Sequence, residues 1–157
     1  ALIKVLNKHP QAELHVVGRM SVDEANTSQT EFNFVHHHLM SYEAMQDFLA
    51  GMDINLAPLS PSLFNDAKSE LKIFEAALHG VVTIASPTDS YAAAIQNGQN
   101  GLLAKTPADW EAALEQLITS PKDRARLGQA AFEQIAPRFS AAHAAQKLLA
   151  VLKTIYD

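Results

Sequence analysis

Four polar side chains recur at intervals of four, three and four residues in the middle of the chain: Lys68, Lys72, Glu75 and His79. On a helix this spacing places all four on one face. Lysines can neutralise a phosphate-bearing ligand, and the carboxylate of Glu75 offers two oxygens that can accept hydrogen bonds from both hydroxyls of a ribose. An ordinary surface pair between Lys72 and Glu75, three residues apart, explains the same spacing without a ligand. Spacing alone leaves both interpretations open.

The apolar residues between these polar ones predict an amphipathic helix over 66–79, closed by Gly80 in the left-handed conformation. A strand is expected at 53–58 just before it. The free backbone N–H groups at the helix start would then point into the crevice at the carboxyl ends of the strands, where they favour an anion such as a diphosphate. Lys68 and the hydroxyl of Ser69 would add one charge and one donor to that site.

The elements that must position these residues alternate along the chain. Strands are expected at residues 13–18, 31–35, 53–58, 81–85 and 101–103. Helices are expected at residues 1–8, 41–51 and 66–79, and after the capping residues Thr106, Ser120 and Ser140. This alternation predicts an α/β fold, a Rossmann-like parallel sheet with helices on both faces, formed as a single domain over residues 1–157.

Composition excludes several classes of function. The chain carries 12 basic and 17 acidic residues, a net charge of -5, and its basic residues are scattered, so a nucleic-acid partner is not expected. With no cysteine, a disulfide framework, a thiolate nucleophile and a cysteine-based zinc site are excluded. No apolar run is long enough to span a membrane, and the first residues carry no secretory leader. We therefore expect a soluble, cytoplasmic protein.

Three consecutive segments, residues 53–59, 64–77 and 80–86, resemble the donor-site core of the GT4-like glycosyltransferases, and residues 97–103 resemble the segment that follows in that family. Order and spacing match over residues 53–103, and the flanking elements fit more loosely. The resemblance implies the C-terminal, nucleotide-sugar-binding half of a two-domain GT-B architecture, without the first strand of that half. That strand would be central, and the sequence leaves open whether its place is closed, vacant or filled. An acceptor-binding N-terminal domain is expected to precede this half.

In that family a glutamate, seven residues and a second glutamate enclose a glycine-rich turn. The second glutamate contacts the nucleotide ribose, and the turn contacts the phosphates. Glu75 matches the second glutamate, whereas Ala67 stands at the position of the first. Residues 68–70, Lys-Ser-Glu, replace the glycine turn, as in a subgroup of the family with a Lys-Ser turn. The resemblance thus implies that Glu75 and Ser69 bind the donor.

Three further loops at the ends of predicted strands are implied to contact the donor. Gly18 and Arg19 match the loop that approaches the donor, although a glycine turn with a solvated arginine explains them as well. His36 opens a run of three histidines where the family places contacts to the base. A zinc site there is disfavoured, because consecutive side chains rarely converge on one centre. Thr88 follows the central strand, where it either touches the donor or turns the chain.

The resemblance implies that the complete enzyme transfers a sugar from a UDP- or GDP-linked donor to an acceptor, a polysaccharide or glycan. No metal or other cofactor is expected. Lys68 and Lys72 are the expected catalytic residues, because with Ser69 and the helix dipole they would stabilise charge on the leaving phosphate. The isolated half should bind nucleotide weakly and catalyse nothing. Whether the full-length enzyme associates peripherally with a membrane stays open. A sugar-nucleotide epimerase of the same architecture and a flavodoxin-like binding module without a substrate are the alternatives.

Overall fold

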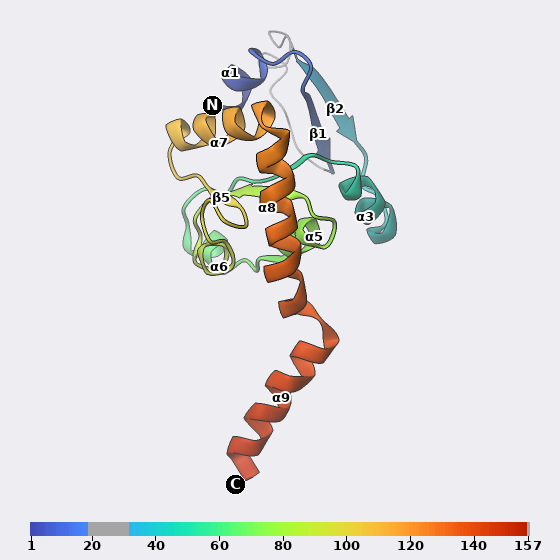
Figure 1. Ribbon diagram of the computed structural model, residues 1–157, viewed down its shortest axis with the longest axis vertical. Helices are drawn as coiled ribbons and strands as arrows, with labels where there is room; N and C mark the ends of the chain where they lie inside the picture. Colours follow the sequence, from blue (N-terminus) through green and yellow to red (C-terminus); the bar gives the residue numbers. More distant parts are fainter. Residues whose placement is uncertain (19–31, 157) are drawn as a thin grey trace.

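A computed structural model describes residues 1–18 and 32–156 of the chain. The strands are β1 (Glu13–Val17), β2 (Asn33–His37), β3 (Ile54–Ala57), β4 (Val82–Ala85) and β5 (Leu102–Leu103). The helices are α1 (Leu2–Leu6), α3 (Tyr42–Ala50), α4 (Leu63–Asp66), α5 (Leu71–Leu78), α6 (Asp89–Ala94), α7 (Pro107–Thr119), α8 (Pro121–Gln134), the 3-10 helix η1 (Ala136–Phe139) and α9 (Ala141–Tyr156). From β2 to β5, helices separate each strand from the next, with α4 and α5 both lying between β3 and β4, and helices follow β5 (Figure 1). The predicted α/β class is confirmed.

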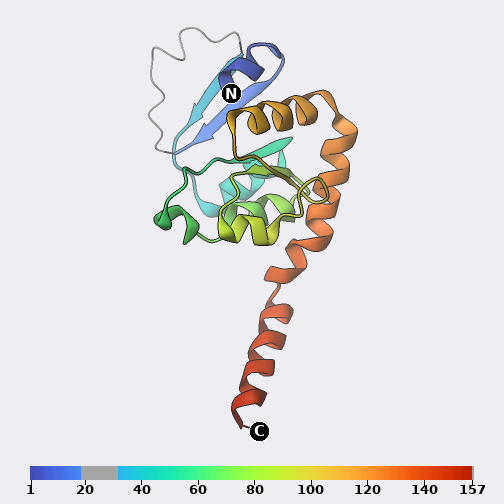
Figure 2. The ribbon, with the colours of Figure 1, turned by 90° about the vertical axis from the view of Figure 1, so that its left-hand side faces the viewer.

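The strands form two parallel sheets instead of the single sheet expected. β1 pairs with β2 in one, and β3, β4 and β5 follow one another in the other. Figure 2 shows the β1–β2 pair lying beyond the edge of the larger sheet. Among the described residues, β1 and β3 have no strand on their other sides.

The larger sheet is covered on both faces because alternate side chains of its strands point in opposite directions. On one face, Val82 and Ile84 of β4 join a core formed with α1, α7 and α8. On the other face, Ala85 joins a core formed with α5, α6 and the end of α8. All of β4 is buried, as predicted for the central strand of a parallel sheet.

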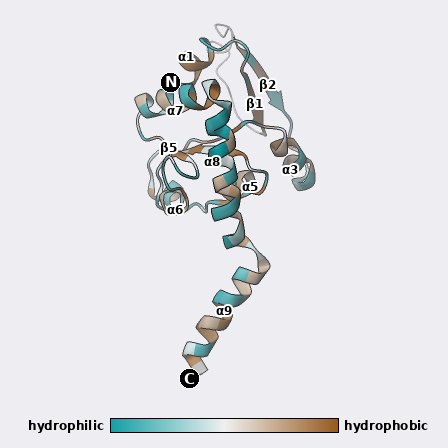
Figure 3. Cartoon of the chain, in the orientation of Figure 1, coloured by the Kyte–Doolittle hydropathy of each residue, from teal (hydrophilic) through white to brown (hydrophobic). Residues whose placement is uncertain are grey.

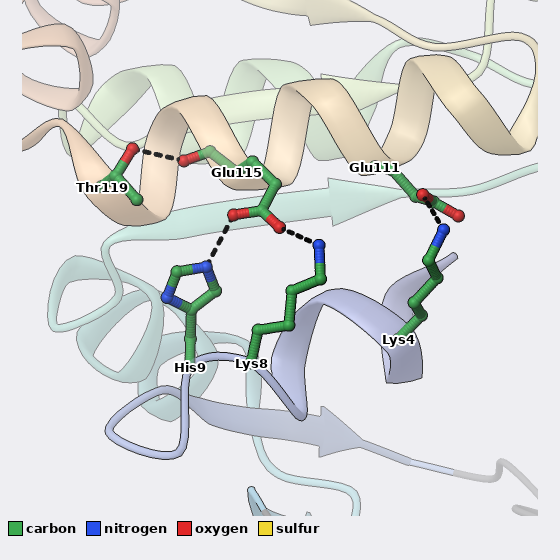
Figure 4. A network of polar contacts seen from close by, with 6 residues as sticks. All are labelled: Lys4, Lys8, His9, Glu111, Glu115 and Thr119. Atoms are coloured by element: carbon green, nitrogen blue, oxygen red, sulfur yellow. Dashed lines mark hydrogen bonds and ion pairs between the residues drawn. The ribbon is translucent and has the colours of Figure 1, made fainter.

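Helix α1 attaches to α7 through an apolar contact flanked by ion pairs. Val5 is fully buried in the core that α7 also lines. Around it, Lys4 Nζ lies 2.6 Å from Glu111 Oε2 and Lys8 Nζ lies 2.9 Å from Glu115 Oε1 (Figure 4). His9 Nε2 also contacts the carboxylate of Glu115, at 2.7 Å. This contact fixes the chain that leads directly into β1.

The predicted helix over residues 66–79 is wrong at its start, because the segment is broken into α4 and α5. Asn65 donates its backbone N–H to the Ser62 hydroxyl, so α4 begins three residues earlier than predicted. After α4, the carbonyl of Lys68 accepts a hydrogen bond from Ser90 Oγ at 2.5 Å, whereas in a continuous helix it would accept from the backbone of Lys72. A serine far along the chain therefore competes with the helix. Gly80 does follow α5 in the left-handed conformation, with φ 68°.

Of three other boundaries, two differ from the sequence expectation and one agrees with it. The second strand covers Asn33–His37 instead of residues 31–35, so that two of the three consecutive histidines belong to β2. Helix α6 lies in a segment that was expected only as a loop. Ser140 starts the last helix as predicted, since its hydroxyl accepts the N–H of His143 at 3.2 Å. That helix, α9, extends away from the rest of the molecule and carries both apolar and polar residues (Figure 3).

Candidate functional site

The turn between α4 and α5 presents the polar groups predicted to bind a diphosphate. Lys68 and Ser69 are exposed, and both precede α5, which begins at Leu71. Because the amides of Leu71 and Lys72 have no acceptor among the described residues, the start of α5 offers free N–H donors. Glu70 occupies the N-cap without a side-chain capping bond. Its negative charge acts against an anion at this helix end, which the sequence interpretation did not anticipate.

Lys68 lies over an aromatic ring. Its Nζ is 5.0 Å from the ring centroid of Phe64, a side chain that is itself largely exposed. A cation–π contact at an exposed site stabilises the cation by roughly 0.5–1 kcal/mol. A charge-assisted hydrogen bond from Lys68 to a phosphate oxygen can replace this contact. Because the helix is broken after α4, Lys68 does not share a helical face with the other three polar residues. Only Lys72, Glu75 and His79 can lie on one face of α5 and the residue that follows it.

Glu75 is a half-buried carboxylate without a partner among residues 1–18 and 32–156. Although Lys72 is three residues away, the structure has no ion pair between the two side chains and no hydrogen bond to Glu75 among the described residues. Partial burial raises the pKa of the Glu75 carboxyl above its usual value, and the charge of Lys72 only partly opposes this effect. The simple surface pair is therefore not formed, and the carboxylate oxygens of Glu75 remain available to a ligand.

The structure brings Gly18 and His36 together at the end of the smaller sheet. Gly18 has φ 95°, a conformation that favours glycine, and its N–H donates to the carbonyl of His37 at 3.0 Å. The carbonyl of Gly18 is in contact with Nε2 of His36 at 2.6 Å. His36 is thus a strand residue whose ring holds the glycine turn. Arg19 lies outside the described residues.

Thr88 is more enclosed than its predicted role suggests. It is only 4% exposed, and its hydroxyl has no hydrogen-bond partner within residues 1–18 and 32–156. Its backbone N–H donates to the carbonyl of Ser86 at 2.9 Å, and it occupies the N-cap of α6. Donor contact by Thr88 stays a prediction.

The predicted residues that the structure describes fall into two groups. Gly18 and His36 belong to the smaller sheet, whereas the α5 turn with Glu75, and Thr88 beside it, belong to the larger sheet. In the described part of the chain, no hydrogen bond or ion pair joins the two groups.

A pocket of about 250 Å³ beside the α5 turn contains side chains that the sequence analysis missed. Its polar lining comes from Glu70, Ser90, Arg138 and Lys147. Ser90 could be anticipated, since it follows the central strand. Arg138 and Lys147 could not be anticipated. They belong to η1 and α9, and no local pattern in the sequence indicates that these helices line the pocket.

The described residues contain no group of three or more potential metal ligands that could hold an ion. In that same part of the chain, no helix is sufficiently long and apolar to cross a membrane.

Comparison with known proteins decides the family. A sequence profile described as "Glycosyl transferase-like" matches residues 1–150. The chain belongs to this glycosyl transferase-like family. None of the curated proteins compared with it matches.

Solved structures agree with the family in their fold. TarM of S. aureus has a TM-score of 0.73 at 18% identity, over 94% of this chain and 30% of its own. HepE of Anabaena has a TM-score of 0.74 at 18% identity, over 98% of this chain and 44% of its own. Sucrose-phosphate synthase of Thermosynechococcus elongatus has a TM-score of 0.71 at 15% identity, over 99% of this chain and 41% of its own.

This glycosyl transferase-like chain therefore spans less than half the length of each of these structures. Its parallel strands with helices on both sides match the C-terminal half of the GT-B architecture, which confirms the predicted fold class.

Proposed function

We propose that this chain is the nucleotide-sugar-binding domain, over residues 1–157, of an enzyme that transfers a sugar from a UDP- or GDP-linked donor to a polysaccharide or glycan acceptor. The observation that carries the proposal is Glu75, a half-buried carboxylate without a partner among the described residues, on a helix that begins with free amides just after the exposed Lys68 and Ser69. Support comes from related folds, since HepE was solved with UDP and glucose and TarM in a complex that contains UDP.

Each group of the α5 turn has a defined task in this proposal. Glu75 accepts hydrogen bonds from the ribose hydroxyls, and Ser69 with the first amides of α5 donates to the diphosphate. During transfer the bond between the anomeric carbon and the phosphate oxygen breaks, and its electron pair stays on that oxygen. Lys68 and Lys72 stabilise the developing negative charge. The acceptor hydroxyl forms the new bond to the anomeric carbon, and its proton passes to the departing diphosphate.

The remaining predicted residues complete the donor site in the whole enzyme. Gly18 and His36 would reach the donor from the smaller sheet and Thr88 from the start of α6, and Arg19, which lies outside the described residues, is proposed to contact it too. An acceptor domain outside this chain supplies the acceptor, and the donor is a substrate, with no further cofactor assigned. The same proposal places the enzyme in the cytoplasm or at the cytoplasmic face of the membrane.

Titration with UDP, GDP and ADP tests this function. We expect weak but measurable binding of UDP or GDP by calorimetry or by amide NMR shifts, and a loss of roughly tenfold in affinity in Glu75→Ala. Glu133→Ala, which removes an exposed glutamate of α8, is the matched control and should leave the affinity unchanged. Failure of all three nucleotides to bind would show a non-catalytic module instead. Equal binding by Glu75→Ala would show that Glu75 does not hold the nucleotide.

A further inference from the structure

The pocket beside the α5 turn is lined by charged side chains that the described part of the chain leaves unpaired. Glu70, Arg138 and Lys147 all line this pocket of about 250 Å³. Within residues 1–18 and 32–156, none of these three side chains makes a hydrogen bond or an ion pair. Because they have no partners of their own, these groups are available to a ligand in the pocket.

The polar groups of the pocket divide into acceptors and donors according to the elements that carry them. The α5 turn and α6 supply the acceptors. The carboxylate of Glu70 accepts hydrogen bonds, and Ser90 already donates its hydroxyl hydrogen to the carbonyl of Lys68, so that Ser90 Oγ can only accept. The helices η1 and α9 supply the donors, because the side chains of Arg138 and Lys147 can only donate.

Apolar groups complete the lining of the pocket. Ala93 and Ala94 of α6 contribute methyl groups, and the ring of Phe139 joins them. Phe74 of α5 holds this ring in place, since the two ring centroids lie 4.3 Å apart and the ring planes are tilted by 34°. A ligand that fills the pocket therefore meets a small apolar surface as well as the charged groups.

This combination of groups selects among small ligands. A simple anion satisfies Arg138 and Lys147 but meets the negative charge of Glu70. A neutral sugar satisfies Glu70 and Ser90 through its hydroxyls but leaves both cations without an acceptor. A hexuronic acid satisfies both sets, because its hydroxyls donate, its carboxylate accepts and its ring C–H groups suit an apolar surface. The planar guanidinium of Arg138 matches a carboxylate with two parallel hydrogen bonds.

We propose that this pocket binds a hexuronic acid, with Arg138 and Lys147 on its carboxylate and Glu70 and Ser90 on its ring hydroxyls. The pocket is a carbohydrate site in addition to the nucleotide site, and it depends on its own groups and not on nucleotide binding. It also gives Glu70 a task, whereas at the start of α5 the charge of Glu70 only opposes an anion. Glycans that contain uronic acid residues are the class of carbohydrate that this site recognises.

Amide NMR of this chain titrated with methyl β-glucuronide tests the site. We expect saturable shift changes at Glu70, Ser90, Ala93 and Ala94. The affinity should be higher by roughly tenfold than that for methyl β-glucoside, which lacks the carboxylate. Acetate, a simple carboxylate, and alanine, a zwitterion, should also bind more weakly than the glucuronide by roughly tenfold, because neither carries the ring hydroxyls.

Variants of the last helices locate the carboxylate. Arg138→Gln should weaken glucuronide binding by roughly tenfold and leave the weaker glucoside binding unchanged. Lys153→Gln removes an exposed lysine of α9 that does not line the pocket, so this control should bind like the parent chain.

Four results would overturn the proposal: no shift changes in the pocket, glucoside binding as tight as glucuronide binding, tighter binding of acetate or alanine, and undiminished glucuronide binding by Arg138→Gln. UDP takes no part in these titrations. A failure here therefore leaves the nucleotide proposal standing, and a failure of UDP to bind leaves the uronic acid site standing.

Discussion

Glu75 is the residue on which the functional interpretation depends. A carboxylate that is partly removed from water without a partner costs stability, which is why its pKa is raised. The ribose hydroxyls of a nucleotide would supply the missing donors. Its neighbours in sequence do not, because neither Lys72 nor any other described side chain pairs with it.

A double-mutant cycle with the ligand tests this contact. Glu75→Gln keeps the size of the side chain but removes its charge, and 2′-deoxy-UDP removes one of the two hydroxyls. We expect Glu75→Gln to weaken UDP binding by roughly tenfold, about 1.4 kcal/mol, and to weaken 2′-deoxy-UDP binding clearly less, as measured by calorimetry. Equal losses with the two nucleotides would mean that Glu75 does not contact the ribose.

The raised pKa of Glu75 predicts a characteristic dependence on pH. Between the usual carboxyl value of 4.5 and the raised one, the folded chain binds more protons than the unfolded chain, so the free energy of unfolding falls as pH rises. Glu75→Gln should remove this slope in urea denaturation. UDP affinity should change in the opposite direction and increase with pH, because the ribose hydroxyls need the ionised carboxylate.

Glu111 is the control for this experiment, because its pKa is lowered whereas that of Glu75 is raised. The hydrogen bond from Lys4 holds the pKa of the Glu111 carboxyl below its usual value, so its contribution to stability is lost as pH falls. Glu111→Gln should therefore leave the falling slope above pH 4.5 intact. A Glu75→Gln curve that matches the parent curve would contradict the burial of Glu75.

At the level of the single residue, the sequence predicted candidates but not their surroundings. It selected Glu75 and Ser69, whereas the absence of an ion pair with Lys72 depends on side-chain directions that spacing does not determine. Arg138 and Lys147 reach the turn only through the path of the last helices. For such residues the three-dimensional arrangement is the only guide.

At the level of elements, two glycines show how closely α8 packs. A Cβ on Gly128 would lie 1.9 Å from the backbone carbonyl oxygen of Gly80, and backbone cannot easily move away. We expect Gly128→Ala to reduce the free energy of unfolding by about 1–3 kcal/mol or more in urea denaturation. Gly51→Ala is the control, since its Cβ would meet Phe48 at an ordinary 3.5 Å. Equal stability of the two variants would contradict the close approach.

Elements with local start signals were predicted well, and those set by distant contacts were not. Thr106 closes a capping box with Asp109, and the Ser120 hydroxyl accepts the N–H of Asp123, as the sequence indicated. The break between α4 and α5 depends on Ser90, whose hydroxyl donates to the carbonyl of Lys68, 22 positions earlier in the chain. Local pattern could not reveal it.

At the scale of the whole molecule, α1 is one of the elements that tie the smaller sheet to the larger. Its ion pairs with α7 are exposed, and exposed pairs contribute little, whereas Val5 is fully buried. We expect Val5→Ala to cost about 2 kcal/mol of unfolding free energy and Glu115→Gln to cost much less. Urea denaturation measures both. A larger loss in Glu115→Gln would mean that charge, not apolar burial, holds α1.

The division into two sheets also explains why the predicted donor residues form two groups. The sequence predicted each strand approximately, but not the split, because pairing between strands depends on which partners are present. Gly18 and His36 lie at the end of the smaller sheet, and Glu75 lies on a helix that covers the larger. The part of the site that the larger sheet builds alone is therefore the part to measure first.

The most direct test of the central claim is an amide NMR map of this chain titrated with UDP. We predict that the largest shift changes fall on Ser69 through Lys72 and on Glu75, that they saturate together, and that uridine without phosphates moves the signals near Glu75 but not those of the turn. Shift changes that avoid α5 and its turn, or their complete absence at saturating UDP, would contradict the claim that this helix binds a nucleotide.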